Sequence, residues 1–162
     1  MLMSTDPENT LTLTLKTGEV KVALRPDLAP MHVARIKELA GQGFYDGSAF
    51  HRVIPGFMAQ TGDPTGTGSG GSRLANLKAE FTPERHVRGT LSMARTSDPN
   101  SANSQFFICF ADAPWLDRQY TVFGRVVEGM EHVDAIKKGG DGNNGAIAGE
   151  PDRIVKARVG RE

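Results

Sequence analysis

Short runs of alternating apolar and polar residues, broken by glycine and proline, constrain the fold of this chain most strongly. Leucines alternate with threonines over residues 11–15, and apolar residues alternate again over 20–24. Period-two alternation is typical of a strand with one buried face, and Thr17-Gly18 between the runs predicts a β-hairpin. Further β-rich runs, separated by segments rich in Gly, Pro, Asp and Ser, are predicted at 50–54, 57–62, 89–94, 105–110, 121–127 and 153–159.

Two segments show a helical period instead. The segment from Pro30 to Gly41 or Gly43 places its apolar residues on one face, with proline suited to the first turn and glycine to the end. A second helix is predicted from Met130 to Lys138, where two glycines follow. Many strands with only two helices predict a mainly β fold, a closed antiparallel barrel.

Length and composition narrow the range of functions. A chain of 162 residues suits one domain, which we expect at 9–162 after a flexible N-terminus at 1–8. Nineteen basic and nineteen acidic residues cancel, so neither nucleic acid nor a membrane surface is an expected partner, and no apolar run approaches the ~20 residues of a membrane span. The absence of a secretory pattern near Met1 and the single Cys109 predict a cytoplasmic protein.

The segment from Phe50 to Asp63 carries the most chemical information. It places Arg52, Gln60 and three large apolar side chains around a Pro-Gly turn, and none of these side chains is a nucleophile or part of an acid/base pair. Such a surface suits rotation about a bond better than cleavage of a bond. A second stretch runs from Gly89 to Phe107 and ends in Ser-Gln-Phe-Phe.

These two stretches resemble the two signatures of the cyclophilin-type peptidyl-prolyl cis-trans isomerases. The resemblance covers about Asn9 to Val159 and implies an eight-stranded closed barrel with a helix over each open end. It implies catalysis of rotation about X-Pro bonds in folding chains, with proline-containing peptides and flexible protein segments as partners, no cofactor and no metal. We expect a monomer.

The chemistry of Arg52 fits this reaction. Rotation about an X-Pro amide is opposed by roughly 20 kcal/mol, because the nitrogen lone pair is delocalised into the carbonyl. In the twisted amide that lone pair returns to nitrogen, so a donor aimed there gains strength only as the bond rotates. Arginine supplies a permanently charged, planar set of donors. Whether it acts on the prolyl nitrogen or on the carbonyl oxygen stays open from sequence.

The resemblance assigns further roles by position. The catalytic set is Arg52, Gln60 and Phe107, and the substrate-binding set is His51, Phe57, Met58, Gly68, Ala94, Arg95, Thr96, Gln105, Trp115, Leu116 and Tyr120. Alternation places Met58 and Gln60 on one face of their strand and Ala59 inside the barrel, while Phe106 and Ile108 face the core opposite Phe107. The long polar stretch 63–88 is expected to be ordered and to line the site.

Three positions of the substrate-binding set bear on specificity. Arg95 stands where asparagine is more usual, and because main-chain groups make that contact in the family, the change should alter charge more than geometry. Tyr120 stands where many relatives carry histidine, which shapes the pocket without transferring a proton. Trp115 matches the indole that binds peptide and cyclosporin, so cyclosporin binding is expected.

Competing interpretations have weaker support. The string Gly66 to Gly71 satisfies G-x-G-x-x-G, but no helix follows it, so a nucleotide site is not expected. The four histidines lack ligand spacing, and we expect His51 to fix the groove wall by hydrogen bonding. Cys109 has no adjacent base and is expected in the core. The alternative function is a catalytically weak proline-binding or scaffolding module on the same fold.

Overall fold

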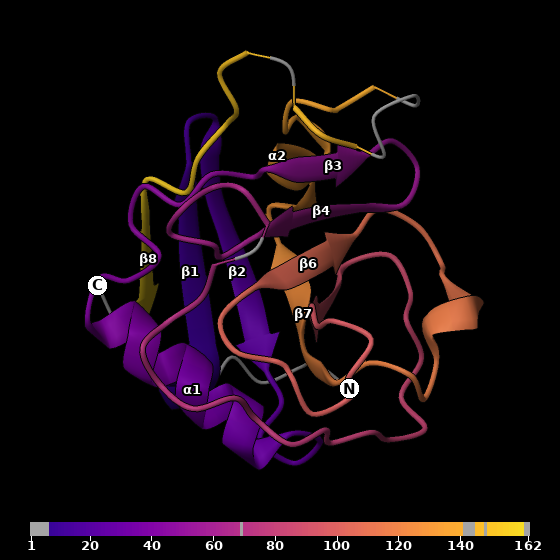
Figure 1. Ribbon diagram of the computed structural model, residues 1–162. Helices are drawn as coiled ribbons and strands as arrows, with labels where there is room; N and C mark the ends of the chain where they lie inside the picture. The colour runs from indigo at the N-terminus through magenta and orange to yellow at the C-terminus, as the bar shows by residue number, and fades with distance from the viewer. Residues whose placement is uncertain (1–6, 69, 141–144, 148, 161–162) are drawn as a thin grey trace.

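One antiparallel sheet dominates the structure. The computed structural model describes residues 7–68, 70–140, 145–147 and 149–160. The strands are β1 (Thr10–Leu15), β2 (Gly18–Leu24), β3 (Arg52–Ile54), β4 (Met58–Thr61), β5 (Thr90–Met93), β6 (Phe106–Cys109), β7 (Val122–Glu128) and β8 (Lys156–Val159). They follow the order β3-β4-β6-β5-β7-β2-β1-β8 (Figure 1). All eight predicted strands are therefore present, most of them shorter than their apolar runs.

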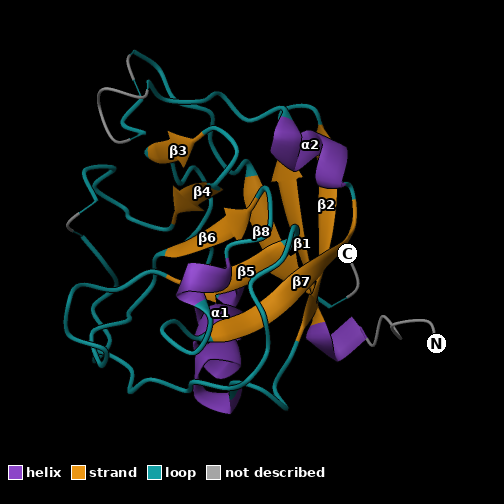
Figure 2. Cartoon of the chain, turned by 90° about the vertical axis from the view of Figure 1, so that its right-hand side faces the viewer, coloured by secondary structure: helices purple, strands orange, loops and turns teal. Residues whose placement is uncertain are grey.

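The two helices lie toward opposite ends of the sheet (Figures 1 and 2). They are α1 (Pro30–Gly41) and α2 (Met130–Asp134), and two single turns of 3-10 helix, η1 (Pro7–Asn9) and η2 (Pro114–Leu116), complete the structure. The second helix was predicted to reach Lys138, which is wrong. It ends early because the Lys137 N–H donates to the Asp152 carboxylate at 2.8 Å and does not continue the helical ladder.

The start of α1 is stabilised from a distance. Its N-cap residue, Ala29, offers no side-chain acceptor. Glu80 takes that role, since its carboxylate accepts hydrogen bonds from the N–H groups of Met31 (3.2 Å) and His32 (3.0 Å). A carboxylate at a helix N-terminus satisfies N–H groups that lack an intrahelical partner. The polar stretch 63–88 is thus anchored to α1, which agrees with the prediction that this stretch is ordered.

The predicted closed barrel is wrong, because the edge strands β3 and β8 do not pair and the sheet is an open half-barrel. Ala146 forms an isolated bridge with β3, and the Gly145 carbonyl accepts from the Val53 N–H at 2.8 Å. The segments 47–50 and 152–154 exchange three further backbone bonds of 2.7–2.9 Å. The connection between α2 and β8 therefore occupies the edge where β8 would have to pair.

The sheet separates two apolar clusters. Ala59, Phe106 and Ile108 are fully buried in the larger cluster, inside the curved sheet, as alternation predicted. Their neighbours point to the opposite face and form a small outer cluster of Met58, Phe107, Cys109, Ala113 and Leu116. This second cluster supports the candidate site.

Two further points concern the helices and the N-terminus. Among the helices of the described residues, none has the length and apolarity that crossing a membrane requires. Residues 1–6, most of the N-terminus that we expected to be flexible, lie outside the described part of the chain, while Pro7 and Glu8 belong to η1.

Candidate active site

The polar side chains of Arg52, Gln60 and Gln105 form a line across the outer face of the sheet. Arg52 on β3 lies opposite Gln60 on β4, and Gln60 lies opposite Phe107 on β6. Arg52 Nη1 donates to Gln60 Oε1 at 3.2 Å, and Gln60 Nε2 donates to Gln105 Oε1 at 2.8 Å. Gln105 donates in turn to the carbonyls of Gly68 (3.0 Å) and Gly70 (2.9 Å). Each amide fixes the next, so the Arg52 guanidinium is held in one orientation.

Beside this line is a pocket of about 190 Å³. Its floor is apolar and rests on the outer cluster, with Phe107 and Met58 almost fully buried. Nine residues line it, and all nine belong to the predicted site: Arg52, Phe57, Met58, Gln60, Ala94, Arg95, Phe107, Leu116 and Tyr120. A small apolar pocket with a charged donor at its edge suits a compact apolar ring beside a polar amide.

A larger pocket of about 500 Å³ adjoins the first. The two share Gln60, Ala94 and Arg95 as a common wall. Three further predicted residues, Gly68, Thr96 and Gln105, line only the larger pocket, together with polar residues that sequence reasoning did not single out: Ser72, Asn76, Ser101 and Asn103. The predicted site therefore divides into two connected compartments.

The stretch after β5 is held by hydrogen bonds within the protein. The Ala94 N–H donates to the Gln105 carbonyl at 3.0 Å, and the Thr96 N–H donates to Ser101 Oγ at 2.9 Å. These two main-chain donors are used within the protein. Ala94 and Arg95 line both compartments, and the contact of main-chain groups of this stretch with a peptide stays a prediction.

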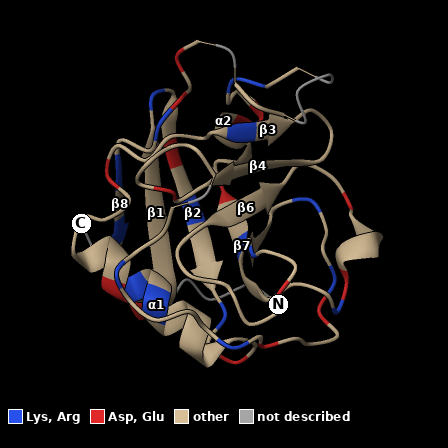
Figure 3. Cartoon of the chain, viewed as in Figure 1, with Lys and Arg blue, Asp and Glu red and all other residues tan. Residues whose placement is uncertain are grey.

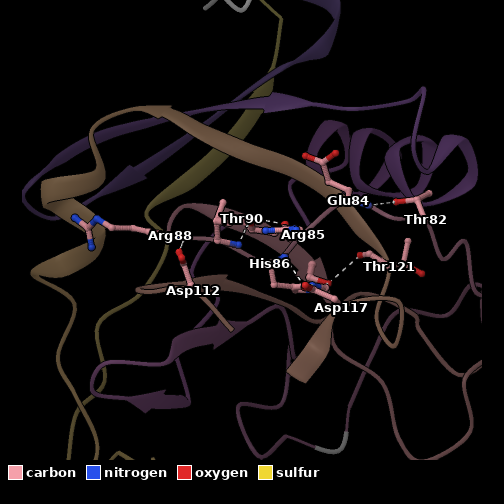
Figure 4. Close-up of polar contacts among 11 residues, drawn as sticks. Thr82, Glu84, Arg85, His86, Arg88, Thr90, Asp112, Asp117 and Thr121 are labelled. Carbon is pink, nitrogen blue, oxygen red and sulfur yellow. Dashed lines mark hydrogen bonds and ion pairs between the residues drawn. The ribbon is translucent and has the colours of Figure 1, made fainter. Parts of the chain in front are cut away.

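A buried histidine supports the pocket floor from beneath. The His86 ring stacks against Phe107, with centroids 6.2 Å apart. Its Nδ1 lies 3.2 Å from Asp117 Oδ1 (Figure 4). Its Nε2 lies 2.9 Å from Ser92 Oγ. Because a carboxylate only accepts, Nδ1 carries the proton, while the Ser92 hydroxyl beside Nε2 also donates to the Thr121 carbonyl at 3.1 Å. Burial lowers the pKa of His86 although Asp117 opposes the change, so the ring is neutral at pH 7.

Sequence reasoning missed this support. It considered His86 only as one of four histidines without the spacing of metal ligands. The signal that would have found its role, proximity to Asp117 across a 31-residue separation, is a tertiary contact. No local periodicity contains that information.

The glycine-rich loop that contains Gly66, Gly68 and Gly70 is organised by one carboxylate. Asp63 accepts from the N–H groups of Thr65, Thr67, Gly68 and Gly70 at 2.6–3.1 Å, and from the Thr65 hydroxyl at 2.7 Å. Burial alone would raise the pKa of Asp63, but these hydrogen bonds hold it well below its usual range. A side chain on Gly70 would collide with the carboxylate, since an added Cβ would lie 2.2 Å from Oδ1. The loop positions the two carbonyls that hold Gln105.

The residues that line the two pockets include no aspartate, glutamate, histidine or cysteine. Proton transfer by a paired acid and base therefore has no obvious agent among the described lining residues. Hydrogen-bond donation from Arg52 next to an apolar pocket is the chemistry that this arrangement supports.

Comparison with known proteins agrees with the geometry. The family described as cyclophilin type peptidyl-prolyl cis-trans isomerase/CLD matches residues 10–159. The chain belongs to this family. It is a cyclophilin-type peptidyl-prolyl cis-trans isomerase, as the two sequence signatures predicted.

Similar proteins cover most of this isomerase. A Brucella suis protein named "Probable peptidyl-prolyl cis-trans isomerase" is 57% identical over 165 residues, which cover 95% of this chain and 84% of that protein. The rat "Peptidyl-prolyl cis-trans isomerase-like 3" is 42% identical over 132 residues, covering 79% of this chain and 81% of the relative. The similarity thus extends to bacterial and animal proteins.

Solved structures share the fold. A cyclophilin from Hirschia baltica superposes with a TM-score of 0.85 at 30% identity, covering 96% of this chain and 75% of its own. A Cryptosporidium parvum cyclophilin type peptidyl-prolyl cis-trans isomerase, crystallised in the presence of the dipeptide Ala-Pro, gives a TM-score of 0.84 at 30% identity, covering 94% and 99%. Both comparisons support the half-barrel as a cyclophilin fold.

Two predicted residues of this cyclophilin-type site line neither pocket. Trp115, on η2, is 63% exposed and packs against Phe57, with ring centroids 5.5 Å apart, so it lies beyond the rim of the smaller pocket. His51 lies behind the loop, where an added Cβ on Gly68 would come within 3.6 Å of its ring. We expected His51 to act by hydrogen bonding, and this stays a prediction: its ring nitrogens are buried, and a hydrogen bond with the Ala49 backbone partly offsets the lowering of its pKa by burial. It contributes packing to the groove wall.

Proposed function

We propose that the 190 Å³ pocket binds the proline ring of an X-Pro segment and that Arg52 stabilises the twisted amide during rotation. The observation that carries this proposal is the hydrogen bond from Arg52 to Gln60, 3.2 Å long, which holds the guanidinium at the edge of a pocket floored by Phe107. The ring would enter the pocket and its amide would lie beside the guanidinium. Apolar walls select proline by shape.

Catalysis at this site depends on preorganisation of the guanidinium. Each 1.36 kcal/mol of stabilisation given to the twisted amide alone increases the rate about tenfold. The line of Gln60 and Gln105 fixes the guanidinium before substrate arrives, so little reorganisation is needed as the bond turns. No atom is transferred in this reaction, so the geometry requires no acid/base partner.

The partners follow from this site. The Cryptosporidium parvum structure obtained with Ala-Pro supports proline-containing peptides and flexible protein segments as ligands. Trp115, exposed beside Phe57, supports cyclosporin binding at the rim. We also infer that the protein assists folding, acts in the cytoplasm as a monomer and forms one domain over 9–162. The unpaired, buried Cys109 fits a reducing compartment, and the single sheet spans residues 10–159.

Replacing Arg52 tests the proposal. In a protease-coupled assay on an Ala-Pro peptide, Arg52→Ala should lose more than about tenfold in kcat/KM, because one preorganised charged donor contributes at least that factor. The matched control, Arg125→Ala, removes an exposed arginine on β7 and should retain full activity. Both variants should unfold near the wild-type temperature. Equal activity of Arg52→Ala and wild type contradicts the proposal, and a large loss of melting temperature would instead show a structural role.

A further inference from the structure

Two residues that differ from those usual in the family contact each other. Arg95 follows β5 and Tyr120 precedes β7, and the Arg95 guanidinium carbon lies 4.5 Å from the centroid of the Tyr120 ring. A guanidinium over an aromatic face is held by cation–π attraction. The same ring makes a T-shaped contact with Phe107, with ring centroids 5.8 Å apart and ring planes at 83°. Tyr120 therefore holds Arg95 against the wall of the smaller pocket.

Backbone carbonyls fix the guanidinium as well. Its Nε and Nη2 donate to the Gln119 carbonyl at 3.1 and 2.6 Å, and its Nη1 donates to the Thr96 carbonyl at 2.8 Å. These contacts use three of the five N–H groups of an arginine, so donors remain while the group is held in place. A long side chain that is already immobilised loses little conformational entropy when it meets a ligand.

The positive charge of Arg95 has no carboxylate partner in the part of the chain that the structure describes. The carboxylate closest in sequence, that of Asp98, accepts from the Asn100 N–H at 2.9 Å. Neither pocket has an acidic lining residue. Basic and acidic residues are interspersed over the chain (Figure 3), so the unbalanced charge is a local feature of the groove.

The position of this charge sets what it can recognise. Arg95 belongs to the wall between the proline-sized pocket and the larger compartment. Neighbouring Cα atoms of a bound chain are 3.8 Å apart, so the residue next to a bound proline, or the one beyond it, lies over that wall. We propose that Arg95, held on Tyr120, makes this isomerase prefer X-Pro segments with an aspartate or glutamate next to the proline or one residue further. The inference rests on the proposed proline site.

The experiment compares matched peptides. Each carries Glu, Gln or Lys at one of the four positions within two residues of a single proline, and isomerisation is measured with wild type, Arg95→Gln, Arg95→Lys and Lys156→Gln. The last variant removes an exposed charge on β8 as a control. We expect wild type to favour Glu over Gln by about threefold to tenfold in kcat/KM at one position or more, with Lys the poorest there. The ratio should fall toward one in Arg95→Gln, fall partly in Arg95→Lys, which cannot stack a planar group, and stay unchanged in Lys156→Gln.

Salt provides a second readout. Because Arg95 is partly exposed, raising the salt from about 50 mM to about 500 mM should reduce the wild-type preference for Glu. The ratio of two peptides within one variant cancels any general loss of activity. An identical Glu/Gln ratio in wild type and Arg95→Gln overturns the inference while leaving the proline site intact. Failure of wild type to isomerise any peptide would overturn both.

Discussion

Single residues of the groove are positioned by one another more than by their own strands. Gln60 both accepts from Arg52 and donates to Gln105, so it transmits the orientation of the glycine-rich loop to the guanidinium. Tyr120 acts similarly between Phe107 and Arg95. The consequence is that a substitution at an intermediate residue should affect catalysis without direct contact between that residue and the rotating bond.

Trp115 allows occupancy of the groove to be followed directly. It is the only tryptophan in the sequence, and its indole lies against Phe57 on the pocket wall. Emission should therefore change saturably when an Ala-Pro peptide or cyclosporin is added, because an indole responds to a change in its surroundings. Trp115→Phe should be silent in the same titration while still folded. Unchanged emission during titration of an inhibited wild-type enzyme would place Trp115 outside the ligand contacts.

At the scale of elements, the loop between β4 and β5 is as important to the site as the strands. Its first turn is closed by Asp63, and its carbonyls at Gly68 and Gly70 hold Gln105. Further along, Glu80 caps α1. A stretch without regular secondary structure is thus fixed at several points and transmits that order to the groove.

We predict that Asp63→Ala reduces both stability and activity. Loss of a buried acceptor leaves several N–H groups unsatisfied, which costs about 1–3 kcal/mol. The Gly68 and Gly70 carbonyls would lose their fixed positions, so kcat/KM should fall several-fold at a temperature where the variant remains folded. Urea unfolding and the protease-coupled assay measure the two effects. Asp112→Ala, which removes an exposed carboxylate outside both pockets, serves as the control. Full activity in Asp63→Ala would show that the loop does not position Gln105.

For the whole molecule, two buried histidines and one half-buried histidine couple stability to pH. Burial lowers the pKa of His32, His51 and His86 below the ordinary 6.5. The unfolded chain then binds protons more readily than the folded protein, so stability is fully present above about pH 6.5 and is lost as the pH falls through the folded values, at up to about 1.4 kcal/mol per pH unit for each histidine. Carboxylates with lowered pKa values contribute only at more acidic pH.

The measurement is urea unfolding at about pH 8, about pH 6.5 and about pH 5, with ionic strength held constant. The midpoint should decrease slightly between the first two values and further at the third. In His86→Asn, which can still hydrogen-bond to Asp117, the decrease should be smaller. A wild-type midpoint that is unchanged or higher at about pH 5 would contradict this assignment of the buried histidines.

Features that depend on a local sequence pattern were predicted correctly from the sequence. Features that depend on contacts between distant segments were not. Alternation correctly placed Ala59 and Phe106 inside and Met58 and Phe107 outside, because the strand period determines which face each side chain takes. The early end of α2 and the open edge of the sheet depend on the connection before β8, which no local pattern reveals. The nine pocket residues were predicted from the family resemblance, seven of them from its two signatures, while the support from His86 and the stacking of Arg95 on Tyr120 required tertiary contacts.

The central claim is that this site turns an X-Pro bond by selective hydrogen bonding without proton transfer. Exchange NMR on an Ala-Pro peptide at equilibrium measures that rotation directly. We predict that wild type increases cis/trans exchange with a rate that is flat from about pH 6.5 to about pH 8, and that Tyr120→His shows the same flat profile with activity within about an order of magnitude. A tenfold pH-dependent step in either protein, or the absence of enhanced exchange, would contradict the account.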